Sequence, residues 1–278
     1  MKGQFLLLAM LCLGLSGWAQ SDTTVRSQVA HDTIHVGNLL IVRDGKEHNE
    51  DSGYIRIHRR HVDHNGYKPS NVSTNWFILD LGFSNFSDKT DYGSASAQQF
   101  APGANSDWFH LRTIKSVNVN IWLFMQRMNL IRHVVNLKYG LGIELNNYRY
   151  TENIKYLTNP TRVIMDTISY SKNKLAADYF TVPFMLNFNF TPHRRNGLAL
   201  SLGASAGYKY SSRQKVKSSV TGKKKTFDDF DMEPWKISWI GELQLGPIRL
   251  YGSLATKSMF KNGLDQTPYS VGIRFSNW

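Results

Sequence analysis

Apolar and polar residues alternate along most of the chain from about residue 75 onward. A period of two is typical of β-strands with one apolar face and one polar face. Each alternating segment has about the length that a tilted strand needs to cross a membrane. The segments cover residues 77–83, 117–125, 135–145, 180–190, 198–210, 235–245, 248–254 and 269–275.

The connectors between these segments alternate strictly between long and short. The short ones are 127–133, 191–197 and 246–247, and the long ones are 87–115, 147–178, 211–234 and 258–267. Transmembrane barrels combine short periplasmic turns with long outer loops, whereas a soluble sandwich has no physical reason to do so. We therefore expect an all-β fold: a transmembrane antiparallel up-and-down β-barrel of about eight strands over residues 74–278.

The alternation also assigns faces. In the second segment it places Val117 through Met125 on the lipid face at every other residue, and Gln126 on the lumen face. Pro183 falls inside the fourth segment. Because proline cannot donate to a ladder, it counts against a central strand there, although a bulge could accommodate it, and the register of this strand is left open.

The first residues have the pattern of a secretory signal. Lys2 precedes an apolar run from Phe5 to Leu15, and Gly17 and Ala19 are the small residues before a cut at Gln20. The run is too short to span a bilayer as a helix. We expect a signal peptide over residues 1–19 and a polar, poorly structured periplasmic segment over 20–73, with short strand-like pieces at 33–42 and 54–57.

Composition agrees with export to the envelope. Aromatic residues make up 13% of the chain, with 7 Trp, which suits the aromatic girdles of barrels. The single cysteine, Cys12, lies in the signal, so the mature chain has no disulfide or thiol chemistry. The net charge of +12 suits an acidic partner. Because the signal peptide indicates export, phosphate-bearing lipid headgroups are favoured over nucleic acid.

Five stretches of the chain carry a family resemblance. They are Thr33–Asn38, Leu79–Phe83, Ser116–Asn120, Tyr139–Tyr148 and Tyr179–Pro183. They resemble the PorT-like small outer-membrane β-barrel proteins of Bacteroidota. The resemblance implies the barrel fold and an outer-membrane location, and it suggests an association with secretion.

The last strand also resembles the assembly signal that barrels present to the insertion machinery, through the spacing of Ser270, Gly272 and Phe275. Trp278 lies on the opposite parity from Phe275, so either the strand stops near Phe275 or a bulge resets its face.

The predicted lumen face collects charges of both signs. An eight-stranded barrel has an interior just wide enough for side chains, so these residues are expected to pair and plug the bore, with an ion path as the alternative. They are Asp80, Lys138, Glu144, Lys236, Glu242, Arg249 and Arg274.

Other candidate sites are less specific. His58, His61 and His64, with Asp63, lack a strong metal-binding spacing. His110 lies near Ser106 and Asp107 in an outer loop, but adjacency does not make a catalytic triad. We expect no catalytic residues, cofactor or metal. A basic cluster from Lys209 to Lys225 suits either a solvated loop or contact with anionic lipopolysaccharide.

The sequence therefore favours an outer-membrane barrel with a structural or interaction role and a non-conducting lumen. Its expected partners are outer-membrane lipid and lipopolysaccharide, the insertion machinery and envelope proteins. The alternatives are a barrel enzyme acting on lipid or peptide, and a soluble periplasmic barrel that binds a ligand.

Overall fold

The structure is a computed structural model that describes residues 32–36, 39–43, 57–59, 69–194 and 196–276. The chain divides into two compact units, Met1–Asp63 and His64–Trp278. The first contains a small antiparallel sheet of β1 (Asp32–Val36), β2 (Leu39–Arg43) and β3 (Ile57–Arg59). The expected signal peptide and cleavage site lie outside the described residues.

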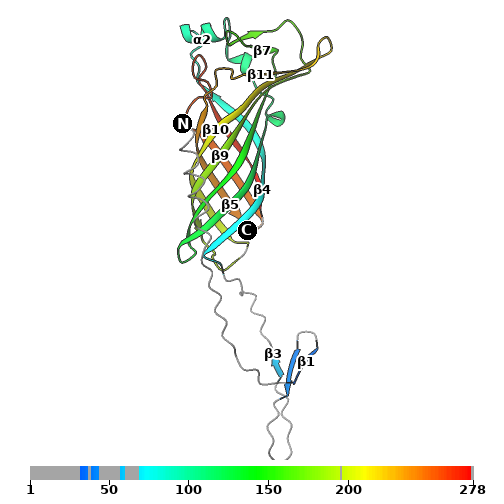
Figure 1. Ribbon diagram of the computed structural model, residues 1–278, viewed down its shortest axis with the longest axis vertical. Coiled ribbons are helices and arrows are strands. Elements are labelled where there is room, and N and C mark those ends of the chain that lie inside the picture. The colour runs from blue at the N-terminus through cyan, green and yellow to red at the C-terminus, as the bar shows by residue number, and fades with distance from the viewer. Residues whose placement is uncertain (1–31, 37–38, 44–56, 60–68, 195, 277–278) are drawn as a thin grey trace, which may run out of the picture. The chain divides into compact units, whose positions relative to one another are not determined.

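The second unit is a closed antiparallel barrel (Figure 1). Its sheet has 9 strands, of which β11 (Gly222–Phe227) pairs with β10 alone, and the pairing of β9 with β10 closes the ring. The remaining strands form the wall, and this confirms the barrel expected from the alternation. They are β4 (Val72–Asp88), β5 (Val117–Ile131), β6 (Val135–Tyr150), β9 (Lys172–Asn189), β10 (Leu198–Ser218), β12 (Trp235–Leu245), β13 (Ile248–Ala255) and β14 (Gln266–Phe275).

The connectors sort to opposite ends of the barrel, as their lengths indicated. The short turns lie at one end and the long connectors at the other, where they carry further elements (Figure 1). These are α2 (Ala95–Phe100), the 3-10 helices Ser106–Phe109 and Thr113–Lys115, β7 (Ile154–Leu157) and β8 (Arg162–Met165). None of the helices in the described part of the chain is long and apolar enough to cross a membrane.

The outer face of the wall is apolar. In β9, for example, Phe180, Val182 and Phe184 are at least half exposed, whereas the alternate residues Thr181 and Met185 are buried. Aromatic side chains gather toward the two ends of this face. Phe180, Tyr208 and Trp235 form a cross-strand row near the long connectors, and Trp76, Phe77, Phe190 and Phe275 lie near the short turns.

The face assignment is wrong for two residues of β5. Met125, expected on the lipid face, is fully buried in the lumen, and Gln126 turns outward to bond Thr74. The pairing of β5 with β6 shifts by one residue between Trp122 and Phe124. A bulge of this kind reverses the face of every residue beyond it, and alternation alone cannot locate it.

Pro183 is accommodated without a bulge. It faces Ser205 of β10 in an unbroken register. On its other side the ladder to β6 is interrupted between Tyr139 and Gly142, and it resumes in the same register. The missing N–H of proline therefore interrupts the ladder to β6 locally, and the register of β9 stays unchanged.

The faces of β6 predict the outcome of a charge substitution. Leu141→Arg places a charge on the lipid face and should destabilise the barrel by about 2–4 kcal/mol if it lies near the midplane. A suitable control is Ser238→Ala, because Ser238 is buried inside and its hydroxyl lacks a hydrogen-bond partner among the described residues. Urea unfolding in lipid vesicles measures both. Equal losses would mean that the faces are assigned wrongly.

Gly142→Ser is a poor control, because a Cβ there would lie 2.6 Å from the ring of Trp122.

Candidate functional site

The charged residues predicted for the lumen lie on the inner face of the wall, and most of them are joined in one network. Arg274 donates to both carboxylate oxygens of Asp80, at 2.7 and 2.8 Å. Its other terminal nitrogen donates to Glu242. Lys138 in turn donates to both oxygens of Glu242 at 2.8 Å. Four charges from four strands are thus held together across the bore.

Three asparagines extend this network toward the long connectors. Asn120 donates to Asp80 at 3.2 Å, and Asn118 donates to both Asn120 and Asn146, at 3.1 and 2.9 Å. Asn146 donates to Glu144 at 3.0 Å, and Glu144 is also paired with Lys236. The network therefore runs without a break from Lys138 to Lys236. The alternation along residues 117–125 implies the inward position of Asn118 and Asn120, but it does not reveal the hydrogen bonds that these side chains make.

Arg249 lies on β13, toward the short-turn end of the barrel. Its guanidinium donates to the backbone carbonyl of Ser276 at 2.8 Å.

An apolar layer fills the bore beside the ion pairs. Ile78, Trp122, Met125 and Met185 pack together inside the barrel. The indole nitrogen of Trp122 donates to Asp80 at 2.7 Å, and the guanidinium of Arg274 lies 5.5 Å from the Trp122 ring centroid. The cavity lined by Trp122, Glu144, Ser205 and Arg274 measures only about 20 Å³, room for about one water molecule.

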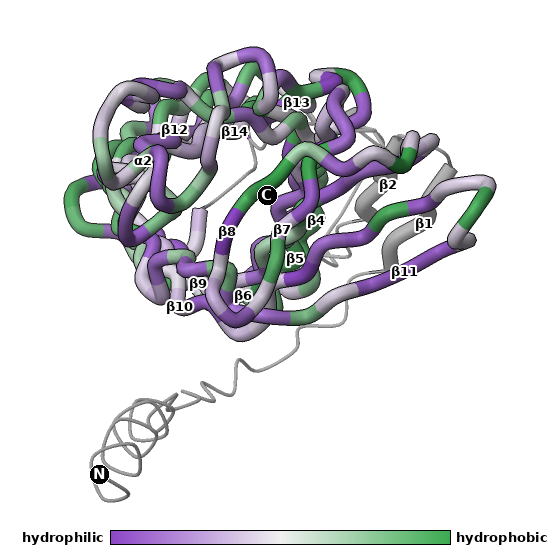
Figure 2. The backbone as a smooth tube through the Cα atoms, turned by 90° about the horizontal axis from the view of Figure 1, so that it is seen from above, coloured by the Kyte–Doolittle hydropathy of each residue, from purple (hydrophilic) through white to green (hydrophobic). Residues whose placement is uncertain are grey.

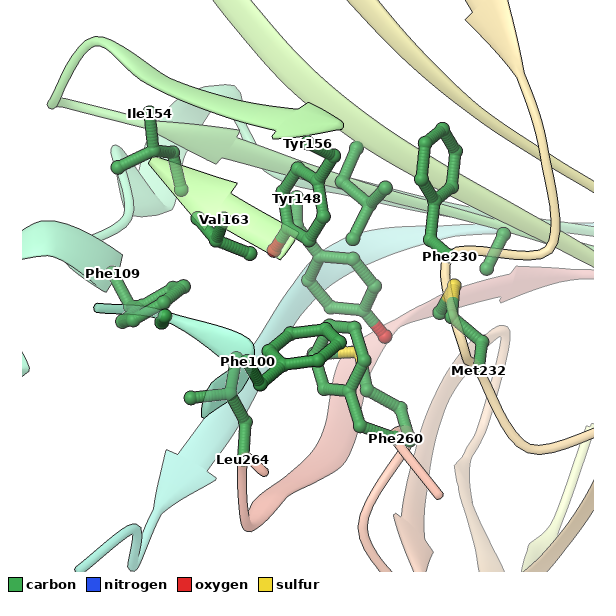
Figure 3. Packing of buried hydrophobic residues seen from close by; sticks show 14 of the residues in the cluster. Phe100, Phe109, Tyr148, Ile154, Tyr156, Val163, Phe230, Met232, Phe260 and Leu264 are labelled. Carbon is green, nitrogen blue, oxygen red and sulfur yellow. The ribbon is translucent and has the colours of Figure 1, made fainter. Parts of the chain in front are cut away.

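The long connectors pack into a second core that closes one end of the barrel. We call it the cap. The side chains of Phe100, Tyr156, Phe230 and Phe260 gather there from four different connectors (Figure 3). The Phe260 ring centroid lies 5.5 Å from that of Phe100 and 6.3 Å from that of Tyr156. The core is defined by Phe100, Ala101, Ala104, Phe109, Tyr148, Tyr150, Ile154, Tyr156, Val163, Leu175, Ala177, Tyr179, Phe230, Met232, Met259, Phe260 and Leu264.

Polar contacts hold the cap to the strands beneath it. Gln214 of β10 accepts from the backbone of Tyr156 at 3.0 Å and donates to the carbonyl of Ile154 at 3.0 Å. At the edge of the cap, Asp229 contacts Lys209 and Lys261. Burial opposes ionisation of Asp229, but the hydrogen bonds from these two lysines outweigh it and lower the pKa of the carboxyl.

The remaining candidate residues do not form a site of their own. The Nδ1 atom of His110 lies 3.8 Å from Asp107, and both side chains are well exposed. Among the residues that the structure describes, no group of three or more His, Cys, Asp or Glu side chains is placed to hold a metal ion. His61, Asp63 and His64 lie outside those residues, and the structure describes His58 only as part of β3.

The proposed assembly signal lies in the last strand, which ends at Phe275. Phe275 is exposed on the outer face and Ser270 is buried. Gly272 has a packing reason to be glycine, because a Cβ there would lie 2.4 Å from the Cα of Gly82 on β4. A role for these three residues in insertion stays a prediction, and Trp278 lies outside the described residues.

One comparison with known proteins identifies a family. Residues 81–260, well over half of the chain, match the family described as outer membrane protein beta-barrel domain. No curated protein matches the chain.

Removing one partner of the lumen network should be costly. Arg274→Met leaves Asp80 without its guanidinium, and we expect a loss of about 3–5 kcal/mol in unfolding free energy. Adding Asp80→Asn should recover part of this loss, because it removes the stranded charge. Urea titrations of the single and double variants in vesicles form a double-mutant cycle. Strictly additive losses would show that the two side chains do not interact.

The cap should loosen independently of the wall. Phe260→Ala removes a ring shared by three connectors, at a local cost of about 3–5 kcal/mol. We expect faster hydrogen exchange across residues 89–116 and 256–265, with unchanged heat-modifiable migration of the barrel on gels. Phe227→Ala is the matched control, since Phe227 is 63% exposed. Unchanged exchange in Phe260→Ala would contradict the cap as a cooperative unit.

Proposed function

The chain belongs to the family of outer membrane proteins with a β-barrel domain, and on that premise we propose that it is a non-conducting barrel that acts as an interaction platform. The observation that carries the proposal is the uninterrupted polar network across the bore, from Lys138 through Asp80 to Lys236. Moving an ion through the bore would require breaking buried ion pairs, each of which is expensive to leave unsatisfied.

The cap supports the same proposal from the other direction. A gated channel needs a mouth that opens, but here four connectors share one apolar core over the end of the barrel. Such a core instead gives the loops a fixed shape, and a fixed surface suits recognition because little ordering entropy is lost on binding.

The two alternative functions fit the structure less well. A soluble ligand-binding barrel would carry its large apolar side chains inside, whereas here they cover the outer face, and the protein is located in the outer membrane. A barrel enzyme would need a base that is held and oriented. The exposed pair of His110 and Asp107 has no such support, and we propose that the protein is not an enzyme.

We further propose a PorT-like, secretion-associated role in the envelope. Its support is the resemblance of stretches such as Leu79–Phe83 and Tyr139–Tyr148, which form parts of β4 and β6. Crosslinking in intact envelopes followed by identification of captured proteins tests this role. Capture of secretion components would support it, and capture of none would leave the platform without a link to secretion.

The closed lumen predicts how the purified protein behaves in planar bilayers. We expect no steady single-channel current. In a Cys12→Ser background, Ser205→Cys should resist a water-soluble maleimide, because Ser205 is only 6% exposed inside the barrel. Thr167→Cys, in an exposed connector, should react readily. Steady currents, or equal labelling of the two cysteines, would overturn the closed lumen and make transport the leading function.

A further inference from the structure

Strands β9, β10 and β11 and the end of β6 extend beyond the membrane-spanning part of the barrel. Their outer face carries rows of positively charged side chains. Strands β9 and β10 contain 18 and 21 residues, whereas about 9–11 suffice to cross a membrane. The hairpin of β10 and β11 projects sideways from the barrel at the long-connector end (Figure 1), and β11 is largely hydrophilic (Figure 2).

The register places the cations directly opposite one another. In one row Arg149 of β6 faces Lys174 of β9, which faces Lys215 of β10, which faces Lys225 of β11. In the next row Lys172 faces Lys217, which faces Lys223. We call these seven residues the cationic wall. Side chains directly opposite lie about 5 Å apart, and like charges there are destabilising.

The strands that carry the cationic wall contribute few acidic side chains to neutralise it. Within the described strand residues 147–150, 172–178, 211–218 and 222–227, Asp178 is the only acidic residue. It is paired with Arg213, which lies beside the wall. A rigid sheet that keeps so many like charges in register is therefore suited to binding a multivalent anion.

The distance of the cationic wall from the membrane surface indicates which anions it can reach. Phe180 marks the aromatic row, and Lys174 lies six residues further along β9. This is about 20 Å along the strand and roughly 15 Å above the aromatic row once strand tilt is included. Phospholipid headgroups lie at the level of the aromatic row, whereas the phosphates and carboxylates on the core sugars of lipopolysaccharide extend beyond it.

We propose that the cationic wall is a docking surface for the anionic core sugars of lipopolysaccharide in the outer leaflet. The surrounding aromatic row would then contact the lipid portion of the same molecules. This site is separate from the lumen, so the proposal does not depend on whether the barrel conducts.

The ionisation of Lys174 provides an independent signature. Burial, followed by the charges of Lys172, Lys215 and Arg213, lowers the pKa of Lys174 to about 8, with Asp178 acting in the opposite direction. Arg149 faces Lys174 from β6. Because a bound anion needs the protonated form, binding should weaken as the pH rises above about 8, well before ordinary lysines lose their charge.

The test compares two double variants of the full refolded barrel. Lys174→Gln with Lys215→Gln removes two charges from the wall. Lys89→Gln with Lys115→Gln removes two exposed charges from the single connector between β4 and β5, at the same end. The probes are rough-type lipopolysaccharide with its core, the same material after dephosphorylation, and phosphatidylglycerol vesicles. Heat-modifiable migration checks the folding of each variant.

We expect the wall variant to bind intact lipopolysaccharide at least about tenfold more weakly than wild type, with a shallower salt dependence. The connector variant should stay within about twofold, and dephosphorylation should remove most of the difference between the variants. Lys174→Arg should bind normally but lose the decline above pH 8, because arginine stays charged.

Three results would overturn the proposal. They are wild-type binding by the wall variant, an equal loss in the connector variant, and an equal loss toward phosphatidylglycerol vesicles. An equal loss in the connector variant would mean that binding depends only on the net charge of the protein. An equal loss toward phosphatidylglycerol vesicles would mean that the cationic wall binds any anionic surface.

Discussion

Arg274 and Asp80 join the last strand of the barrel to the first through a buried ion pair, and the closed wall depends on this seam. The two residues are direct partners in the ladder between β14 and β4. A two-point contact between guanidinium and carboxylate also specifies geometry, so a slip of one residue at this seam would break it. Because Asp80 also accepts from Asn120 and Trp122, the seam is tied to β5 as well.

The narrow bore explains why this network has to be complete. Eight strands leave room for side chains but little for water, so each buried charge must find its partner among the side chains that meet inside the bore. Glu242 illustrates this, since it accepts from Lys138 on one side of the bore and from Arg274 on another. The asparagines connect the charged groups by hydrogen bonds, because an amide can donate to one neighbour and accept from the next.

The two ends of the barrel are built by different physical means. At the short-turn end the strands simply reverse, whereas at the other end an apolar core made of connectors sits directly above the polar lumen. The cap packs the connectors against one another, and strands β9 and β10 stay paired with each other as far as Lys172 and Lys217. The cationic wall lies on this extension, so its like charges are held by the sheet and cannot move apart as they would in a flexible loop.

The sequence by itself determined the barrel, the location of its strands and most of its two faces. This was possible because a wall between lipid and a polar bore imposes a period of two on every strand, as in Val135–Leu145 of β6. It also placed the lumen charges on one face, since that assignment follows from parity.

Tertiary structure alone decided the remainder. The bulge that turned Met125 inward arises from pairing between strands, and the partners of Glu242 come from residues 104 and 32 positions away. The cap escaped detection because its aromatic residues are scattered through irregular connectors without any period. The row of Arg149, Lys174, Lys215 and Lys225 likewise depends on register across four strands, and register is a relation between distant segments that no local pattern contains.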